Sequence, residues 1–289
     1  MKKYLFIINL IFLINSCDIV EGPYIKDSDS YVNPEKKVLI EDFTGHRCTG
    51  CPTATKEISA IQDVYGNQVI AIAIHPSGAG FFTQPHSPNL QGFQYDWRTS
   101  WGDNWDETFQ ASAPGLPKGM VNRIGNQSKI LDSGEWAAVV ADELKKEVDY
   151  KIDITSDANS VTLRTEIQND INGNFKYVVC LTESNIINWQ KDGTLNIEDY
   201  EHNHVLRTVL ADEELSSTTN YSAGQIIEKT ISYDLSSLEQ LNIDYSFQNE
   251  QYGNGNAGGW NASNMSVVAY IYNEITKEIM QVEEVDLNN

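Results

Sequence analysis

Two of the four cysteines, Cys48 and Cys51, are separated by only two residues in the stretch "EDFTGHRCTGCPTA", residues 41–54. A pair at this spacing can bind zinc, form a structural disulfide or exchange disulfides with other thiols. Zinc would need two more soft ligands close by, and the third thiol, Cys180, lies far along the chain. A loop this small removes little entropy from the unfolded chain, so it would be a poor staple. The residues leave all three uses open and favour redox exchange.

Redox exchange suits the pair because it lies between an expected strand and an expected helix. Unpaired N–H groups at a helix N-terminus stabilise a thiolate, and Arg47 and a protonated His46 would add to this effect. Cys48 would then be the nucleophile. Cys51 would be the resolving cysteine that attacks a mixed disulfide on Cys48 and releases the product.

The elements around this pair read as strand, helix and strand. The run 37–43 is short and apolar, 52–65 carries apolar residues at helical spacing up to Gly66, and 68–75 is apolar on both faces. This order implies a right-handed crossover between parallel strands, with helices covering the sheet. Residues 76–110 follow as an aromatic-rich insertion with one or two short helices, and 132–147 is an expected helix.

The pattern changes near residue 148. Seven segments beyond it alternate apolar and polar residues between turn-forming residues, which predicts antiparallel strands in an all-β, immunoglobulin-like sandwich. These segments are 148–157, 160–168, 174–184, 202–210, 225–235, 265–273 and 277–287. We therefore expect an α/β domain over residues 36–147 and a β-sandwich domain over residues 148–289.

The N-terminus has the pattern of an exported lipoprotein. Residues 1–16 carry two lysines, an apolar run and a small-residue end, as in a signal peptide. The sequence "INSC" resembles a bacterial lipobox, which implies lipidation of Cys17, and residues 17–35 are polar like a tether. The formal net charge of −21 argues against nucleic acid and anionic lipid headgroups as partners. Membrane attachment would therefore rest on the lipid at Cys17.

The stretch "IEDFTGHRCTGCP" resembles the strand and active-site turn of the thioredoxin-like superfamily. This resemblance makes Asp42 the buried acid that accepts a proton from the resolving cysteine. The segment "GLPKGMVNRIG" matches the region of the superfamily's cis-proline, which implies that Pro117 is cis and lies against the cysteines. The backbone of Leu116 would then pair with an extended substrate. Arg47 replaces the usual tryptophan, and Thr49-Gly50 replaces the usual Gly-Pro.

A closer resemblance covers most of the chain. The leader, "VLIEDFTGHRCTGCPTA", "EHNHVLR" and "VVAYIYNEITKEIMQ" are similar to the twenty-eight-kilodalton outer-membrane lipoprotein family of the Bacteroidetes. This similarity implies a thioredoxin-like domain followed by a β-sandwich, anchored at the outer membrane.

Two functions are consistent with these patterns. The first is a lipid-anchored thiol-disulfide oxidoreductase, with Cys48, Cys51 and Asp42 as catalytic residues. Its substrates would be protein or small-molecule thiols and disulfides, bound near Leu116, Pro117, His46 and Arg47. The second is a non-catalytic binding or adhesion lipoprotein that uses the thioredoxin-like domain as a scaffold.

Solvent access to Cys48 distinguishes the two functions. Burial of Cys48 beneath residues 76–110 would favour the binding role, whereas an open groove beside Pro117 would favour the redox role. We predict no cofactor and no metal, because His202 and His204, the best paired metal ligands, more often make structural hydrogen bonds at a strand entry.

Overall fold

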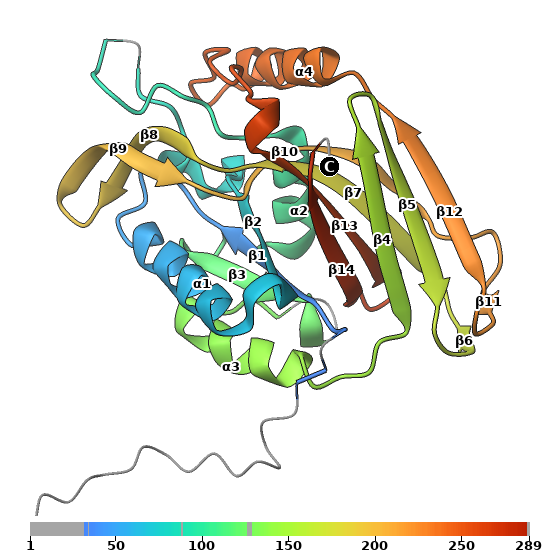
Figure 1. Cartoon of the computed structure of the whole chain (residues 1–289). Coiled ribbons are helices and arrows are strands. Elements are labelled where there is room, and N and C mark those ends of the chain that lie inside the picture. The colour runs from blue at the N-terminus through green and yellow to red at the C-terminus, as the bar shows by residue number, and fades with distance from the viewer. Residues whose placement is uncertain (1–31, 34, 88, 126–128, 288–289) are drawn as a thin grey trace, which may run out of the picture. The chain divides into compact units, whose positions relative to one another are not determined.

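The computed structural model describes residues 32–33, 35–87, 89–125 and 129–287, which form one compact unit. The expected signal peptide, Cys17 and most of the expected tether lie outside the described residues. The part described is a mixed α/β structure dominated by β-sheet (Figure 1).

The first part of the chain forms the expected strand, helix and strand. Strand β1 is Val38–Phe43, helix α1 is Cys51–Tyr65 and β2 is Val69–Ile74. β1 and β2 pair in parallel, as their runs of branched apolar residues predict. The remaining elements of this part are the 3₁₀ turns η1 (Gly66–Gln68) and η2 (Ser77–Phe82), helix α2 (Ser100–Phe109), strand β3 (Lys118–Val121) and helix α3 (Ser133–Glu143).

All seven segments expected to be strands beyond residue 148 contain a strand. They are β4 (Tyr150–Asp157), β5 (Ser160–Ile167), β7 (Phe175–Glu183), β10 (Val205–Glu214), β12 (Ile226–Ser232), β13 (Met265–Asn273) and β14 (Ile279–Asp286). The structure adds further elements: β6 (Ile171–Asn172), β8 (Ile186–Asp192), β9 (Leu195–His202), β11 (Asn220–Tyr221), helix α4 (Leu235–Gln248) and the 3₁₀ turn η4 (Ala262–Asn264).

The strands on the two sides of residue 148 share one sheet. Its seven strands follow the order β14-β13-β7-β10-β2-β1-β3, so β10 of the second part pairs with β2 of the first. The register places Val205 opposite Ala73, and the Ala73 N–H donates to the carbonyl of His204 at 2.8 Å. Residue 148 therefore marks a change in strand pattern and not a break between two sheets, because β2 offers an open edge that β10 fills.

A second, smaller sheet provides the sandwich-like part of the structure. It has the order β12-β5-β4, and it packs across an apolar core on β7, β10 and β13 of the large sheet (Figure 1). Tyr150 and Leu163 of the small sheet meet Leu181 and Val267 of the large one in this core. The expected alternation of the small strands is present, but an independent immunoglobulin-like domain is not, because four of the seven expected strands belong to the shared sheet.

Helices cover the part of the large sheet that holds the cysteines. α1 and α3 pack together on one face, where Ile58, Ile61 and Trp136 lie in one core with Val38 and Ile40 of β1. Trp105 of α2 belongs to the core of the other face. The cysteine pair therefore lies at the end of a strand that is fixed from both faces.

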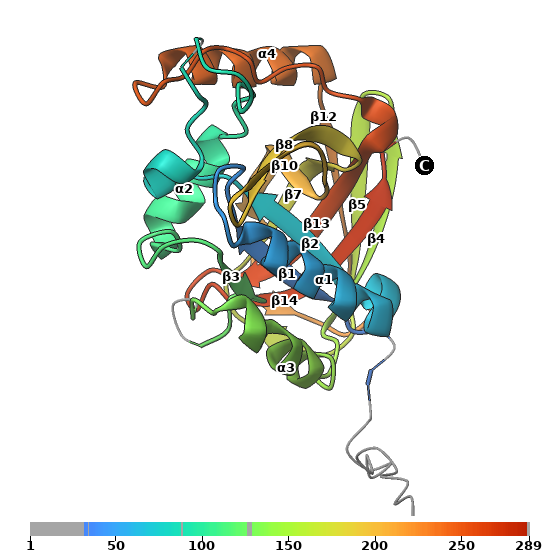
Figure 2. The same ribbon diagram turned by 90° about the vertical axis from the view of Figure 1, so that its left-hand side faces the viewer.

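The aromatic insertion does contain short helical pieces, η2 and α2, but it is more than a local satellite. It lies beside α4 and the loop after it (Figures 1 and 2). Asp96 forms a buried ion pair with Arg98, and its Oδ2 atom accepts a hydrogen bond from the Ser246 hydroxyl of α4 at 2.7 Å. The Tyr95 hydroxyl donates to the carbonyl of Ala257. α4 was not foreseen from the sequence, and it ties the insertion to the second half of the chain.

We expect Gly119→Ala to destabilise the fold by about 2 kcal/mol, because overpacking a buried site costs roughly this much. A Cβ at Gly119 would lie 2.6 Å from the Trp136 ring and 2.7 Å from the carbonyl oxygen of Glu41. Gly134→Ala is the matched control, since no atom lies within 4 Å of its added Cβ. Urea unfolding of both variants measures the difference; equal midpoints would contradict the packing described for β3 and α3.

Candidate functional site around the Cys48–Cys51 disulfide

The two cysteines of the CxxC stretch are joined in a disulfide, with their Cα atoms 5.5 Å apart. Cys51 is the first residue of α1 and is followed by Pro52, which suits the first turn because a proline has no N–H to leave unpaired there. Cys48 lies before the helix, where its N–H donates to the carbonyl of Gly45. Both cysteines are only 1% exposed.

The residues carried over from the thioredoxin-like resemblance lie around this disulfide. The Leu116–Pro117 peptide bond is cis. A Cβ added to Gly50, between the cysteines, would lie 3.5 Å from the Pro117 ring, so Pro117 is next to the CxxC turn. Leu116 and Pro117 are partly buried. The CxxC turn and the Leu116–Pro117 segment are therefore neighbours, as the resemblance implied.

Asp42 lies near the end of β1, where it is 2% exposed. Its Oδ1 atom has no hydrogen-bond partner among the described residues. Burial disfavours the charged form, so it raises the pKa of Asp42 from 3.8 to about 8. The Asp42 carboxyl is therefore protonated at neutral pH and close to the point at which it releases its proton.

His46 is buried too deeply to be the protonated neighbour of Cys48 described above. Its side chain is completely buried, and its ring stacks on Phe93 with the centroids 5.8 Å apart. Burial, assisted by the neighbouring His75 and His202, lowers the pKa of His46 well below its usual value. The expectation that a protonated His46 favours the Cys48 thiolate is wrong, because the site is too dry to hold that charge.

Arg47 is directed toward the end of η2 and the residue pair after it. Its backbone N–H donates to the carbonyl of Phe82 and its Nη1 to the carbonyl of Gln84, both at 3.0 Å. Its guanidinium lies 3.9 Å from the centre of the Phe81 ring. These contacts hold one side of the CxxC turn against the aromatic insertion.

The other side of the turn is held by the β8–β9 hairpin, which the sequence did not predict. The N–H groups of Lys191 and Gly193 donate to the carbonyls of His46 and Thr49 at 2.8 and 3.0 Å. The Gln190 side-chain amide donates to the carbonyls of Gly45 and Cys48, each at 3.2 Å. No spacing or motif around "NWQKDG" marks these residues, because only the tertiary fold brings them to the cysteines.

The aromatic insertion and the β8–β9 hairpin also touch each other. The rings of Phe93, from the insertion, and Trp189, from β8, lie 5.5 Å apart. The insertion and the hairpin therefore meet beside the CxxC turn, and Cys48 in that turn is buried, as the binding role would require.

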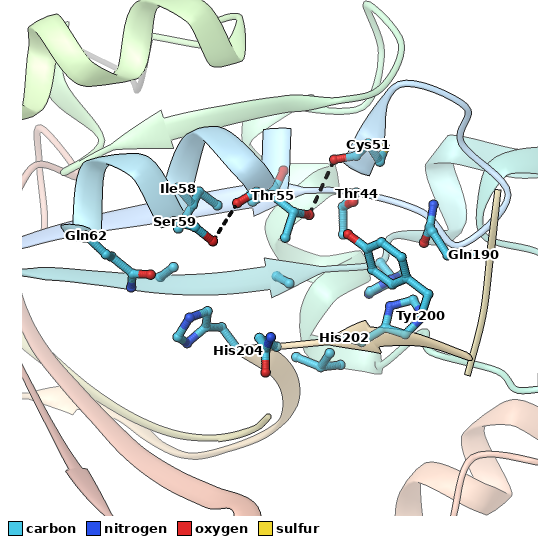
Figure 3. A pocket seen from close by; sticks show the side chains of 16 residues that line it. Thr44, Cys51, Thr55, Ile58, Ser59, Gln62, Gln190, Tyr200, His202 and His204 are labelled. Atoms are coloured by element: carbon cyan, nitrogen blue, oxygen red, sulfur yellow. Dashed lines mark hydrogen bonds between the residues drawn. The ribbon is translucent and has the colours of Figure 1, made fainter. Parts of the chain in front are cut away.

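A cavity of about 160 Å³ lies between α1, β2, the inner face of the β8–β9 hairpin and the start of β10 (Figure 3). Asp42 and Cys51 line it, together with His75, Tyr200 and His202, whereas Cys48 does not. Burial lowers the pKa of His202 to about 4 and that of His75 well below its usual value, so these rings are neutral. His202 and His204, weighed above as a metal pair, both belong to the wall of this cavity.

The remaining thiol is remote from this site. Cys180 is free and buried in the core of the large sheet, where its Sγ donates to the carbonyl of Val268. Among the residues that the structure describes, no three histidine, cysteine or acidic side chains form a group that could hold a metal ion. The described helices include none that is long and apolar enough to cross a membrane.

Several known structures resemble this chain at low sequence identity. HBP35 of Porphyromonas gingivalis is 16% identical, with a TM-score of 0.61 over 88% of this chain and 76% of that one. A crystal structure of a protein from Agrobacterium tumefaciens is 11% identical, with a TM-score of 0.51 over 88% of this chain and 95% of that one. At these identities the likeness concerns the fold alone.

A crystallised domain of the outer membrane lipoprotein Omp28 from Porphyromonas gingivalis is 16% identical over 50% of this chain and 91% of that one, with a TM-score of 0.26. Among curated proteins, none matches this sequence. The family model described as outer membrane protein Omp28 matches residues 103–289, well over half of the chain. The chain therefore belongs to the Omp28 family of outer membrane proteins, as its motifs led us to expect.

Proposed function

We propose that the Cys48–Cys51 pair is a thiol–disulfide exchange centre of the bacterial cell envelope, held in a thioredoxin-like arrangement of β1, α1, β2 and β3. The proposal is supported by the position of the disulfide at the junction of β1 and α1 and by the cis-Pro117 beside it. It is also supported by the antiparallel pairing of β3 with β1, which brings Pro117 to that junction.

The observation that carries the proposal is the state of Asp42. A buried carboxyl group without a partner costs free energy, and a disulfide that only staples a loop needs no such neighbour. A group whose pKa is about 8 can, however, both donate and accept a proton at the pH of the envelope. Asp42 and Cys51 line the same cavity, so they lie on the same side of the disulfide.

The chemistry assigned to Asp42 is a proton transfer coupled to disulfide exchange. When two thiols outside the protein reduce the disulfide, the S–S bond between Cys48 and Cys51 breaks and the two outside sulfurs become a disulfide. The Asp42 carboxyl then supplies the proton that converts the Cys51 thiolate to a thiol. In the opposite direction the Asp42 carboxylate takes this proton back, which prepares Cys51 to attack.

A second function is favoured by one specific observation, the 1% exposure of Cys48. A protein that only binds or adheres could bury its disulfide permanently beneath residues 76–110 and the β8–β9 hairpin. The disulfide would then contribute rigidity alone, and the protein would act through its surface. Reduction without unfolding separates this function from the first.

We expect the disulfide to open and close reversibly in buffers of oxidised and reduced dithiothreitol while the protein stays folded. Its reduction potential should lie above about −300 mV, because disulfides that serve only as staples resist reduction more strongly. Mass spectrometry after alkylation gives the reduced fraction, and circular dichroism reports the fold. Cys180→Ala is the control that assigns the alkylated thiols to Cys48 and Cys51. A disulfide that opens only when the protein unfolds would establish the scaffold function.

We expect Asp42→Asn to stabilise the protein at neutral pH. The pKa of Asp42 is raised in the folded protein, so the unfolded chain loses this proton near pH 4 and the folded protein only near pH 8. The free energy of unfolding of the wild type therefore falls relative to the variant between these two values. The extra stability of Asp42→Asn over the wild type should be absent at pH 4 and reach a few kcal/mol at pH 8, since one pKa unit is worth about 1.4 kcal/mol. Urea unfolding at both pH values measures it, and a pH-independent difference would show that the buried carboxyl is not protonated.

A further inference from the structure

The aromatic insertion (residues 76–110) and the β8–β9 hairpin decide what can reach the disulfide from the side of Cys48. The hairpin backbone donates to the carbonyls of His46 and Thr49, and the insertion accepts from the N–H of Arg47. Lys56 of α1 and Asp192 of β8 add an ion pair at 3.9 Å at the exposed edge of this contact. The Cys48 side of the turn already has hairpin backbone against it, so an extended protein chain could not approach without displacing β8.

The cavity lined by Cys51 offers small molecules a different route to the disulfide. It exists because Ala71 and Ala73 of β2 have short side chains, so α1 and β10 do not close over this strand completely. Its volume of about 160 Å³ is close to that of an engineered cavity that holds a benzene molecule. Ser59, on the exposed face of α1, lines the cavity and places part of its wall at the protein surface (Figure 3).

The walls of the cavity select by charge as well as by size. No lysine or arginine lines it, and the acid and the imidazoles that do are neutral for the reasons given above. Hydroxyl groups of Thr44, Thr55 and Tyr200 lie along it, next to the apolar side chain of Ile58. A small uncharged molecule with one polar group is therefore suited to this cavity, and a large anion is not.

We propose, building on the exchange function above, that small uncharged thiols reach the disulfide through this cavity and that Cys51 is the sulfur they attack. This reverses the order expected from the sequence, in which Cys48 reacts first. The reason is the geometry: Cys51 lines the cavity together with Asp42, whereas Cys48 does not line it and its carbonyl is bonded to the Gln190 amide of the hairpin.

The reaction balances with two molecules of the same thiol. The first, as a thiolate, forms a bond to the Cys51 sulfur, and the bond between Cys51 and Cys48 breaks with its electron pair leaving on Cys48. A second thiolate attacks the sulfur of the bound thiol, which releases a small disulfide and the Cys51 thiolate. Cys51 takes its proton from Asp42. Of the two protons that the thiols released, one goes to Cys48 and the other restores the Asp42 carboxyl. The small thiols are oxidised, and the protein disulfide is reduced.

The experiment compares the reduction of the folded, oxidised protein by 2-mercaptoethanol, which is small and uncharged, and by glutathione, which is larger and anionic. A short peptide disulfide with the sequence of residues 46–53 corrects for the intrinsic reactivity of the two thiols. We expect the preference for 2-mercaptoethanol to be at least tenfold greater in the protein than in the peptide. Equal preferences in protein and peptide would overturn the proposal.

A variant pair tests the route itself. Ser59→Phe places a large ring at the cavity wall and should slow reduction by 2-mercaptoethanol at least tenfold. Ala60→Phe, the next position of α1, is also exposed but does not line the cavity, and it should leave the rate unchanged. Equal rates in the two variants would show that the thiol enters elsewhere.

Two variants, each of which keeps one cysteine of the pair, identify the reacting sulfur. With 2-hydroxyethyl disulfide, the Cys51 thiol of Cys48→Ser should form a mixed disulfide at least tenfold faster than the Cys48 thiol of Cys51→Ser. The reverse order would overturn the proposal and leave the exchange function intact. If no thiol reduces the folded protein at a potential above about −300 mV, the exchange function itself fails. Failure of the cavity route and failure of the exchange function are therefore distinguishable.

Discussion

The parallel pairing of β2 with β10 is the contact on which the site depends. β2 follows α1 and belongs to the part of the chain that carries the cysteines, whereas β10 follows the β8–β9 hairpin directly. Once Val205 lies opposite Ala73, the hairpin that precedes β10 has to emerge beside α1. The same pairing closes one wall of the cavity and brings Tyr200, His202 and His204 to it. One strand pairing thus provides both the cover over Cys48 and the open space beside Cys51.

Burial then sets the electrostatics around the disulfide. Asp42, His46, His75 and His202 are all buried, and none of them gains an opposite charge that would offset the loss of water. All four are therefore held in their neutral forms near pH 7. A neutral site that keeps a protonated carboxyl next to a disulfide is consistent with the proposed proton transfer to Cys51. It also explains why the charge expected on His46 is absent.

Much of this structure could be predicted from local patterns. The apolar runs of β1 and β2, the helix that begins at Cys51 and the alternating strands beyond residue 148 all follow from side-chain periodicity, and the structure contains them. The cis peptide bond at Pro117 followed from a motif resemblance and is present as well. These features depend on residues that are close together in the sequence.

What could not be predicted depends on pairing between distant segments. The sequence of β10 alternates like that of an antiparallel strand, and nothing in it indicates a parallel partner more than a hundred residues earlier. The hairpin strands β8 and β9 carry polar residues on both faces, so their periodicity is weak, and α4 has little separation of apolar and polar faces. The sheet that continues across the boundary placed at residue 148 could not be foreseen for the same reason.

The most direct test of this account compares two rates in the same oxidised protein. Hydrogen exchange at the Lys191 and Gly193 amides reports how often the hairpin leaves the CxxC turn, because both amides are bonded to carbonyls of that turn. If small thiols enter through the cavity, reduction by 2-mercaptoethanol at high concentration will be faster than this opening. If the rate of reduction instead levels off at the opening rate, the hairpin is the gate and the cavity is not the route.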